Sequence, residues 1–208
     1  MWDFVVKGGP LMWLIMLCST IAFGVFIEKV WHLQRIKINT DKFMEEIFNL
    51  IKHNRIVEAI EKCGNTPGPI ARTMKMGILR HDRTRNEIRQ TMEDSGIHEI
   101  PKLEKNLAIL ATIAHITPLL GLLGTVTGMV EAFQVIQQQA VSMMPISPGD
   151  LAGGIWKALI TTVAGLSVAI PTYVAYNYLV SRVNSFVLDM EKSATELVNV
   201  LVAKREVT

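Results

Sequence analysis

The chain has 208 residues, of which 50% are hydrophobic and only 19% are charged. Globular proteins carry about 25% charged residues, so this deficit, with a mean hydropathy of +0.30, favours a membrane protein. The apolar content excludes an intrinsically disordered chain, ordinary Gly and Pro counts exclude a collagen, and two cysteines exclude a disulfide-stapled secreted fold. With 21 basic against 19 acidic residues, the net charge of +2 does not indicate a nucleic-acid partner.

Three apolar runs approach or exceed the roughly 20 residues that cross a bilayer as a helix. They extend over Pro10–Ile27, Leu107–Val130 and Leu151–Val180. We therefore predict an all-α integral membrane protein with three transmembrane helices, at residues 10–31, 107–133 and 151–180. A removable signal peptide is the alternative for the first run, because Lys7 precedes it, but no small-x-small cleavage pattern is followed by a secreted-looking domain.

Lysine and arginine gather on one side of the predicted spans. They follow the first span, precede the second and follow the third: Lys29, Arg35, Lys37, Lys42, Arg89, Lys102, Lys105, Arg182 and Lys192. The other side has Lys7, with Lys157 just within a span. Because basic residues mark the cytoplasmic side, we expect the amino terminus outside and the carboxyl terminus inside. The remaining segments are an outer amino terminus (1–9), a cytoplasmic helical region (32–106), an outer loop (134–150) and a cytoplasmic carboxyl-terminal helix (181–208).

Apolar residues at helical spacing recur through the predicted cytoplasmic segments. One stripe is formed by Phe43, Ile47, Leu50 and Ile51, and another by Val187, Met190, Ala194, Leu197 and Leu201 near the carboxyl terminus. The Gly64–Pro69 segment is a loop signal, and Thr84 with Glu87 matches a capping box. The helix that it opens could run unbroken into the second span, so we expect long helices that extend from the membrane into a cytoplasmic helical domain. Cys18 and Cys63 are interpreted as packing residues.

Small residues form a stripe on each of the last two spans. The stripes are Thr117, Gly121, Thr125 and Gly128 in the second span, and Ala158, Thr162, Gly165 and Ala169 in the third. Within lipid such stripes allow close helix packing, which is our interpretation of the glycines Gly121, Gly124, Gly128 and Gly165. Three spans are too few to enclose a transport path, so we expect a homo-oligomer in which the stripes face neighbouring subunits or a central lumen.

The polar residues of these spans allow two interpretations. Thr125, Thr161 and Thr162 either bond to a carbonyl of their own helix or line a polar path between subunits. Thr117 is a further candidate for the pathway or for packing. His115 is either a buried neutral imidazole bonded to a neighbouring helix or a proton relay.

The sequence contains no recognisable catalytic or metal-ligating motif. The glycines at positions 121, 124 and 128 have no preceding strand, so they do not form a dinucleotide site, and the histidines are scattered. We therefore expect no enzymatic activity, no cofactor and no metal. The central thirds of the three spans contain no carboxylate. Because ion translocation usually needs an ionisable group in this low-dielectric zone, a partner would have to supply it.

Three segments carry a resemblance to a known family. They are GLLGTVTGMVEAF at Gly121–Phe133, LAGGIWKALITTVAGLSVAIP at Leu151–Pro171, and the Pro67–Pro69 break followed by Ile70, Ala71 and Arg72. With the order of spans and cytoplasmic segments, they resemble the MotA/TolQ/ExbB family of proton-channel subunits, and its ExbB/TolQ branch in particular.

The resemblance implies a pentamer in the bacterial inner membrane that encloses the single transmembrane helices of two copies of an ExbD- or TolR-like partner. The partner contributes an aspartate, and Thr125 and Thr162 align with the threonines that line the ion path. Such a complex uses the proton motive force to energise a TonB- or TolA-like periplasmic protein for outer-membrane transport or envelope maintenance. The alternatives are a MotA-like stator subunit of a gliding or flagellar-type motor and a non-conducting membrane scaffold.

One position departs from the family pattern. Many members have a glutamate just before the Ala158-Leu159 pair, where this chain has Lys157. A lysine at mid-bilayer would cost about 2.5 to 3.5 kcal/mol on insertion scales, although near a helix end it can snorkel to the interface. Our hypothesis is that Lys157 pairs with Glu131, which should lie at similar depth at the outer end of the second span. The substitution leaves open which ion the chain uses.

Overall fold

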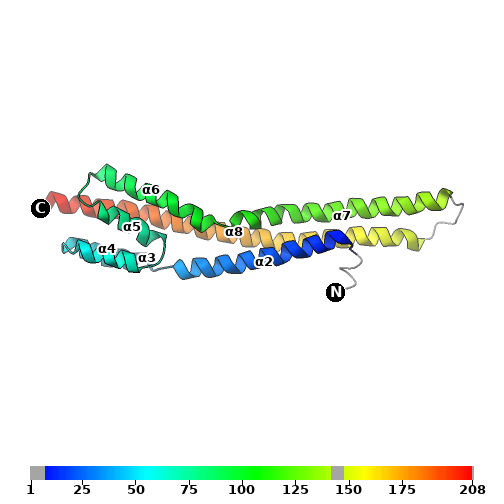
Figure 1. Ribbon diagram of the computed structural model, residues 1–208, viewed down its shortest axis with the longest axis horizontal. Helices are drawn as coiled ribbons and strands as arrows, with labels where there is room; N and C mark the ends of the chain where they lie inside the picture. The colour runs from blue at the N-terminus through cyan, green and yellow to red at the C-terminus, as the bar shows by residue number, and fades with distance from the viewer. Residues whose placement is uncertain (1–7, 142–147, 208) are drawn as a thin grey trace. The chain divides into compact units, whose positions relative to one another are not determined.

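The computed structural model describes residues 8–141 and 148–207 of the chain. This part of the chain is helical and contains no strand, which confirms the all-α prediction. In chain order the helices are α2 (Pro10–Ile36), α3 (Thr40–Lys52), α4 (Ile56–Asn65), α5 (Pro69–Leu79), α6 (Arg85–Glu104), α7 (Leu107–Val141) and α8 (Pro148–Val207), as Figure 1 shows.

Helices α2, α7 and α8 each contain a stretch that is long and apolar enough to cross a membrane, in agreement with the three predicted spans. Only 17%, 39% and 28% of these stretches, respectively, is buried within the chain. Water-soluble monomers rarely expose apolar surface on this scale, so lipid or other chains must cover it.

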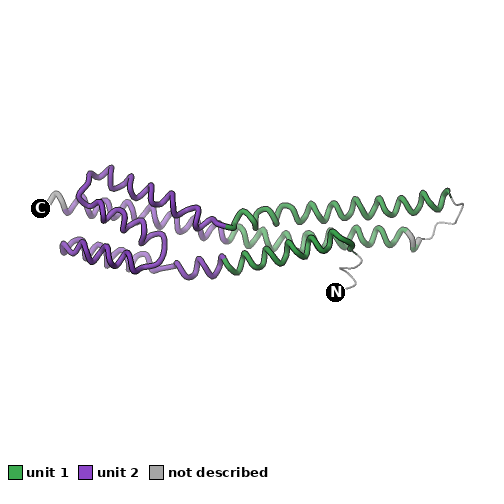
Figure 2. Tube along the Cα trace, in the orientation of Figure 1, with its two compact units in different colours: residues 1–28, 106–178 green, residues 29–105, 179–208 purple. Residues whose placement is uncertain are grey.

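The chain divides into two compact units, which Figure 2 distinguishes by colour. Unit 1 comprises residues 1–28 and 106–178, so it contains α7 and the amino-terminal parts of α2 and α8. Unit 2 comprises residues 29–105 and 179–208, so it contains α3 to α6 and the carboxyl-terminal parts of α2 and α8. The apolar spans and the predicted cytoplasmic helices thus fall largely into separate units.

Unit 2 is built around a hydrophobic core to which α3, α4, α5, α6 and the end of α8 all contribute. Because the apolar residues of each helix recur at a spacing of three and four, one face of every helix points into this core. Buried members of both predicted stripes belong to it, namely Phe43, Ile47, Ile51, Met190, Leu197 and Leu201. The structure therefore confirms that the carboxyl-terminal stripe packs on the other helices of this unit.

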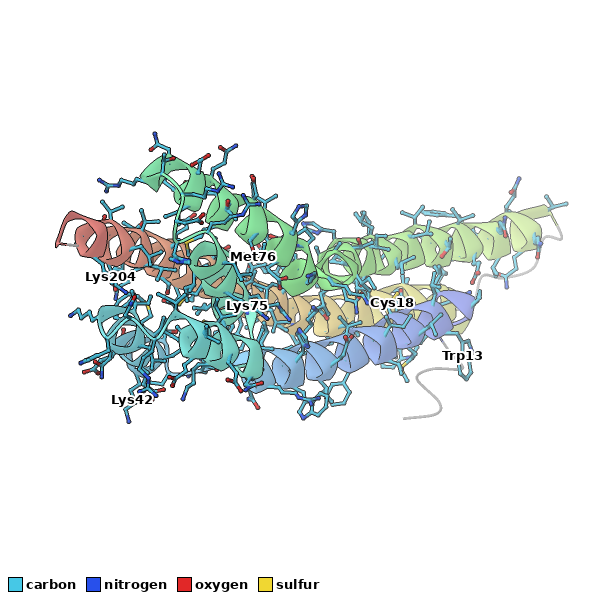
Figure 3. All side chains as sticks on the ribbon, turned by 60° about the vertical axis from the view of Figure 1, so that its left-hand side comes forward. Trp13, Cys18, Lys42, Lys75, Met76 and Lys204 are labelled. Atoms are coloured by element: carbon cyan, nitrogen blue, oxygen red, sulfur yellow. The ribbon has the colours of Figure 1, made fainter. Side chains whose placement is uncertain are left out.

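Polar contacts close the ends of two helices in unit 2. Thr84 and Glu87 form the predicted capping box at the start of α6, where the Thr84 amide donates to the Glu87 carboxylate at 2.9 Å. Near the end of α8, Lys204, labelled in Figure 3, donates to the Ile51 carbonyl at 2.6 Å and to Asn54 Oδ1 at 2.9 Å. The ammonium of Lys204 thereby satisfies a carbonyl at the end of α3.

The predicted loop between α4 and α5 is tight and packs against the end of α2. Gly68, which immediately precedes α5, has a φ of 114°, a conformation that side-chain-bearing residues rarely adopt. A methyl group at this position would also lie 3.0 Å from the carbonyl oxygen of Ile36, the last residue of α2. Glycine is therefore needed here for its backbone conformation and for the close approach of two main chains.

Among the residues of unit 2 whose burial is described, Lys29 and Glu99 are charged and buried, and the sequence did not indicate either. The ammonium of Lys29 donates to the Leu103 carbonyl at 3.2 Å, near the end of α6. Glu99 is 5% exposed and forms ion pairs with Arg72 at 2.7 Å and with Lys102 at 2.6 Å. Lys29 thus caps α6, while Glu99 joins α6 to α5.

The expectation of an unbroken helix from the capping box into the second span is wrong. Helix α6 ends at Glu104, Lys105 has an extended conformation with φ −46° and ψ 136°, and Asn106 has a φ of 66°. Asparagine tolerates this left-handed conformation better than most residues because its short side chain bonds locally. The chain therefore leaves one helix and starts another within two residues.

Two of the three helices extend past the predicted membrane spans. Helix α2 continues to Ile36, past the span at residues 10–31, and α7 continues to Val141, past the span at residues 107–133. Residues 134–141 contain no Gly or Pro and include four glutamines, so nothing in them stops the helix. The third span and the carboxyl-terminal helix form one helix, α8, of 60 residues. Residues 1–7 and 142–147, assigned to the outer segments, lie outside the described residues.

Candidate functional site

Helices α7 and α8 pack against each other in unit 1 through small residues, a contact that we call the α7–α8 seam. It consists of Thr117, Gly121, Gly124, Gly128 and Ala132 on α7, and of Gly154, Ala158, Thr161 and Gly165 on α8. Gly121 lies against Gly165, whereas Gly128 lies against Gly154. Because the contacts that advance along α7 move back along α8, the two helices run antiparallel.

The seam is so close that a methyl group does not fit at its glycines. A methyl at Gly128 would lie 2.7 Å from the carbonyl oxygen of Gly154, and one at Gly165 would lie 2.8 Å from that of Thr117. Close approach of this kind replaces the hydrophobic effect as the source of helix association within lipid. The other glycines of the predicted packing set, Gly121 and Gly124, both face Thr161.

The expectation that the small-residue stripes face neighbouring subunits or a lumen is wrong for most of their members. They face each other within one chain, and Gly124 rather than Thr125 completes the buried stripe of α7. Steps of three and four residues keep Gly121, Gly124 and Gly128 on one face, whereas Thr125 is turned by about 100° from Gly124. On α8, in the same way, Thr161 is buried and the adjacent Thr162 is only half-buried.

Thr125 and Thr162 lie at the edge of the seam and are both half-buried. The Thr162 hydroxyl donates across the seam to the Gly121 carbonyl at 3.1 Å, and the Thr125 hydroxyl donates to the Leu122 carbonyl at 2.6 Å. Each hydroxyl thus has a carbonyl acceptor, as the packing interpretation requires. Each oxygen nevertheless keeps a lone pair with which it can accept a further hydrogen bond.

The two threonines lie on the same side of the seam. Gly124 faces Thr161, and Thr125 and Thr162 are the next residues along their respective helices. Two antiparallel helices that face each other turn to the same side when each advances by one residue. Their hydroxyls bond the carbonyls of two consecutive residues, Gly121 and Leu122, so they lie at nearly the same level of α7. Together they form one polar strip beside a dry contact.

Thr117 and Thr161 are instead buried in the seam itself. Their hydroxyls are used within their own helices, since Thr117 donates to the Ile113 carbonyl at 2.5 Å and Thr161 donates to the Ala158 carbonyl at 2.9 Å. Back-bonding of this type is the usual arrangement for a threonine in a membrane helix. Of the two interpretations, packing describes their surroundings.

His115 is exposed within the single chain, so a contact with a helix of another subunit and a role as a proton relay both stay predictions. Its Nδ1 lies 2.7 Å from the Ala111 carbonyl of its own helix, and since a carbonyl can only accept, Nδ1 carries the proton in this contact. The ring also meets Tyr173 of α8 edge-on, with the ring centres 6.4 Å apart. In the described structure, the His115 ring therefore bonds to the Ala111 carbonyl of its own helix and not to an acceptor of a neighbouring helix.

Glu131 and Lys157, the predicted ion pair, are brought together where the apolar run of α7 ends. The Lys157 ammonium donates to both carboxylate oxygens of Glu131, at 2.6 and 2.8 Å. The side chains are 23% and 50% exposed for Lys157 and Glu131, respectively. The pair joins α7 to α8 at the end of the seam where Gly128 lies against Gly154.

Sequence reasoning missed Gly154, which forms the closest backbone contact with Gly128. The available signal was the Gly153-Gly154 pair at the start of the third span, but it does not reveal which glycine faces a neighbour. Across the described residues, no group of three or more His, Cys, Asp and Glu side chains is placed to hold a metal ion. The chemistry of this site therefore rests on hydroxyls and one ion pair.

Comparison with known proteins agrees with the resemblance. The model of the MotA/TolQ/ExbB proton channel family matches residues 65–192, which include the seam. A protein named as an ExbB homolog in Methanothermobacter thermautotrophicus is 29% identical over 179 residues, covering 86% of this chain and 62% of that protein.

Two relatives, one named TolQ and one named ExbB, share higher identity over shorter stretches. The Tol-Pal system protein TolQ of Haemophilus influenzae is 40% identical over 105 residues, covering 50% of this chain and 43% of that protein. The biopolymer transport protein ExbB of Aquifex aeolicus is 39% identical over 90 residues, covering 43% and 58%, respectively. The matches span less than two thirds of the length of each of these three relatives. The chain is a membrane protein that belongs to the MotA/TolQ/ExbB proton channel family, in its ExbB/TolQ branch.

Proposed function

We propose that this chain is the channel subunit of an ExbB/TolQ-type complex that is driven by the proton motive force. The observation that carries the proposal is the polar strip of Thr125 and Thr162, half-buried on one side of the seam. No carboxylate occurs in the apolar runs of α7 and α8 between Leu107 and Val130 or between Leu151 and Val180. Hydroxyls that accept hydrogen bonds, in spans without an acid, suit a path whose acid comes from another chain.

The acid is supplied by the transmembrane helix of an ExbD- or TolR-like single-span partner. Five copies of the chain surround two partner helices in the bacterial inner membrane, with the amino terminus periplasmic and the carboxyl terminus cytoplasmic. Supporting this assembly, at most 39% of any apolar span is buried within one chain, so most of each span is left for lipid and other helices. Thr125 and Thr162 face the partner's carboxylate as protons pass.

The complex transmits the energy of the ion gradient to a TonB- or TolA-like periplasmic protein, for outer-membrane transport or envelope maintenance. One elementary charge that crosses 100 mV releases about 2.3 kcal/mol. A single passage is thus comparable to one or two hydrogen bonds, so substantial mechanical work requires repeated passages.

The test is to purify the chain with its single-span partner and to reconstitute the complex in liposomes that contain a pH-sensitive dye. Native mass is expected to show five copies of the chain with two of the partner, and an imposed potential is expected to drive proton flux. Liposomes with this chain alone, or with a partner whose intramembrane aspartate is replaced by asparagine, are the controls. Equal flux in these controls, or no flux in the complete complex, would refute the proposal.

A further inference from the structure

One ammonium group in unit 1 is surrounded by three segments of the chain. Lys157 of α8 binds both oxygens of Glu131 of α7, at 2.6 and 2.8 Å. The third segment is the residue before α2: a methyl built on Gly9 would lie 2.9 Å from Cε of Lys157 and 3.3 Å from its Nζ. The backbone at Gly9 therefore covers the lysine, whose side chain is only 23% exposed.

The position of Gly9 is fixed by the start of α2. Its carbonyl accepts from the Met12 amide at 3.1 Å, and its φ of 71° lies in the left-handed region. A residue with a side chain would be strained in this conformation and would displace the lysine. The pair is thus enclosed on one side by main chain, while the Glu131 carboxylate remains 50% exposed on the other.

The two charges have few charged neighbours in the sequence, of which the nearest is Asp150, seven residues before Lys157. Lys157 is the only Lys or Arg between Lys105 and Arg182, and Glu131 is the only acidic residue between Asn106 and Gly149. Glu131 is therefore the only carboxylate of α7 that a cation can meet when it approaches the carboxyl-terminal end of this helix. The ammonium of Lys157 already occupies that carboxylate and cancels its charge.

The pair also lies further toward this end of the helices than the polar strip. Glu131 follows Thr125 by six residues and Lys157 precedes Thr162 by five, which places the pair about 7–9 Å from the threonines along the helices. With the orientation of the proposed function, a proton or other monovalent cation from outside reaches Glu131 before it reaches the hydroxyls.

We propose that Glu131 and Lys157 form a charge-neutral outer gate, in which the lysine ammonium occupies the carboxylate in place of an inbound monovalent cation. The cation is loaded when it replaces the ammonium at Glu131, and the ammonium returns when the cation moves inward. This inference rests on the proposed function, since it requires a conducting complex. It adds an entry site and a resident competitor to the path through Thr125 and Thr162.

The experiment compares variants of the complete complex in liposomes under a fixed potential. Lys157→Met keeps the length of the stem and removes the competitor, so cation flux is expected to rise roughly tenfold, equivalent to about 1.4 kcal/mol. Glu131→Gln leaves an uncompensated ammonium, so flux is expected to fall at least tenfold. The exchange of Glu131→Lys with Lys157→Glu rebuilds a neutral pair and is expected to restore flux relative to either single reversal. Gln134→Met, at an exposed position of α7, is the matched control.

The opposite signs of the two single variants distinguish a gate from a structural ion pair. A pair that only stabilises the fold would lower flux in both variants in parallel with thermal stability, and this result would overturn the inference. So would unchanged flux in Lys157→Met when Thr125→Val still blocks conduction, an outcome that leaves the proposed function intact. A wild-type complex that passes no cation would instead overturn the proposed function and the gate with it.

Discussion

Two adjacent glycines at the start of α8 offer a sharp test of the seam. An ideal methyl at Gly154 would lie 2.7 Å from the Gly128 carbonyl oxygen and 2.9 Å from Ala132 Cβ. Ordinary contact begins at 3.4 Å, so the shortfall is 3.4 − 2.7 = 0.7 Å against a main-chain atom that cannot rotate away. At Gly153 a methyl meets nothing within 4 Å. The two glycines are thus adjacent on the same helix but differ in the room that is available for a side chain.

The expected effects of alanine at the two positions have opposite signs. Gly153→Ala should stabilise the chain by up to about 1 kcal/mol, because alanine is the better helix former. Gly154→Ala gains the same propensity but overpacks the seam, so a net loss of about 1–2 kcal/mol is expected. Unfolding in mixed detergent micelles, followed by far-ultraviolet circular dichroism, measures both. Equal stability of the two variants would refute the reasoning, because it would mean that α7 and α8 separate easily.

Three further outcomes follow from single residues. Thr125→Val and Thr162→Val should each lower proton flux of the reconstituted complex at least tenfold. Thr127→Val is the control, because Thr127 lies on the opposite side of α7, and it should leave the flux within twofold. Loss of flux in all three variants would argue against a specific polar strip. Burial raises the pKa of Cys63 from 9.0 to about 12. The unfolded chain therefore loses its thiol proton first, and stability present below pH 9 should fall between pH 9 and 12 by at most about 1.4 kcal/mol per pH unit. Cys63→Ala should remove that part of the pH dependence in chemical denaturation, and an unaltered profile would contradict it. Gly68→Ala should lower the melting temperature by several degrees, because its φ of 114° is strained for alanine and a methyl would meet a backbone carbonyl at 3.0 Å; an unchanged melting temperature would show that the loop can relax.

The spacing of apolar residues was sufficient to predict the spans and the core of unit 2, because a helix face on which apolar residues recur is stable only when it is buried. Ile47 and Leu197 are fully buried for this reason. It was also sufficient to identify the set of small residues on α7 and α8. It did not separate Gly124 from Thr125, because adjacent residues differ only by the rotation of the helix toward its partner, and that rotation depends on both helices.

Buried charges were the least predictable feature. Lys29 was counted as a marker of the cytoplasmic side, yet its ammonium is enclosed and bonded to the Leu103 carbonyl. Nothing within a few residues of Lys29 indicates an acceptor 74 positions away. Glu131 and Lys157 were suggested as a pair because each stood alone at a similar depth of an apolar helix, and the structure places them in contact. A charge in an apolar run thus narrows the search for its counterion, whereas a charge in a polar segment does not.

The closeness of the seam has a mechanical consequence. Helices that touch through main chain have no side-chain rotamers with which to absorb sliding, so a shift along the axis would drive the Gly128 and Gly154 backbones into each other. Within one subunit α7 and α8 are thus expected to move as a single stiff wall. Any helix of another chain that packs against this pair would therefore move along its outer surface and not between α7 and α8.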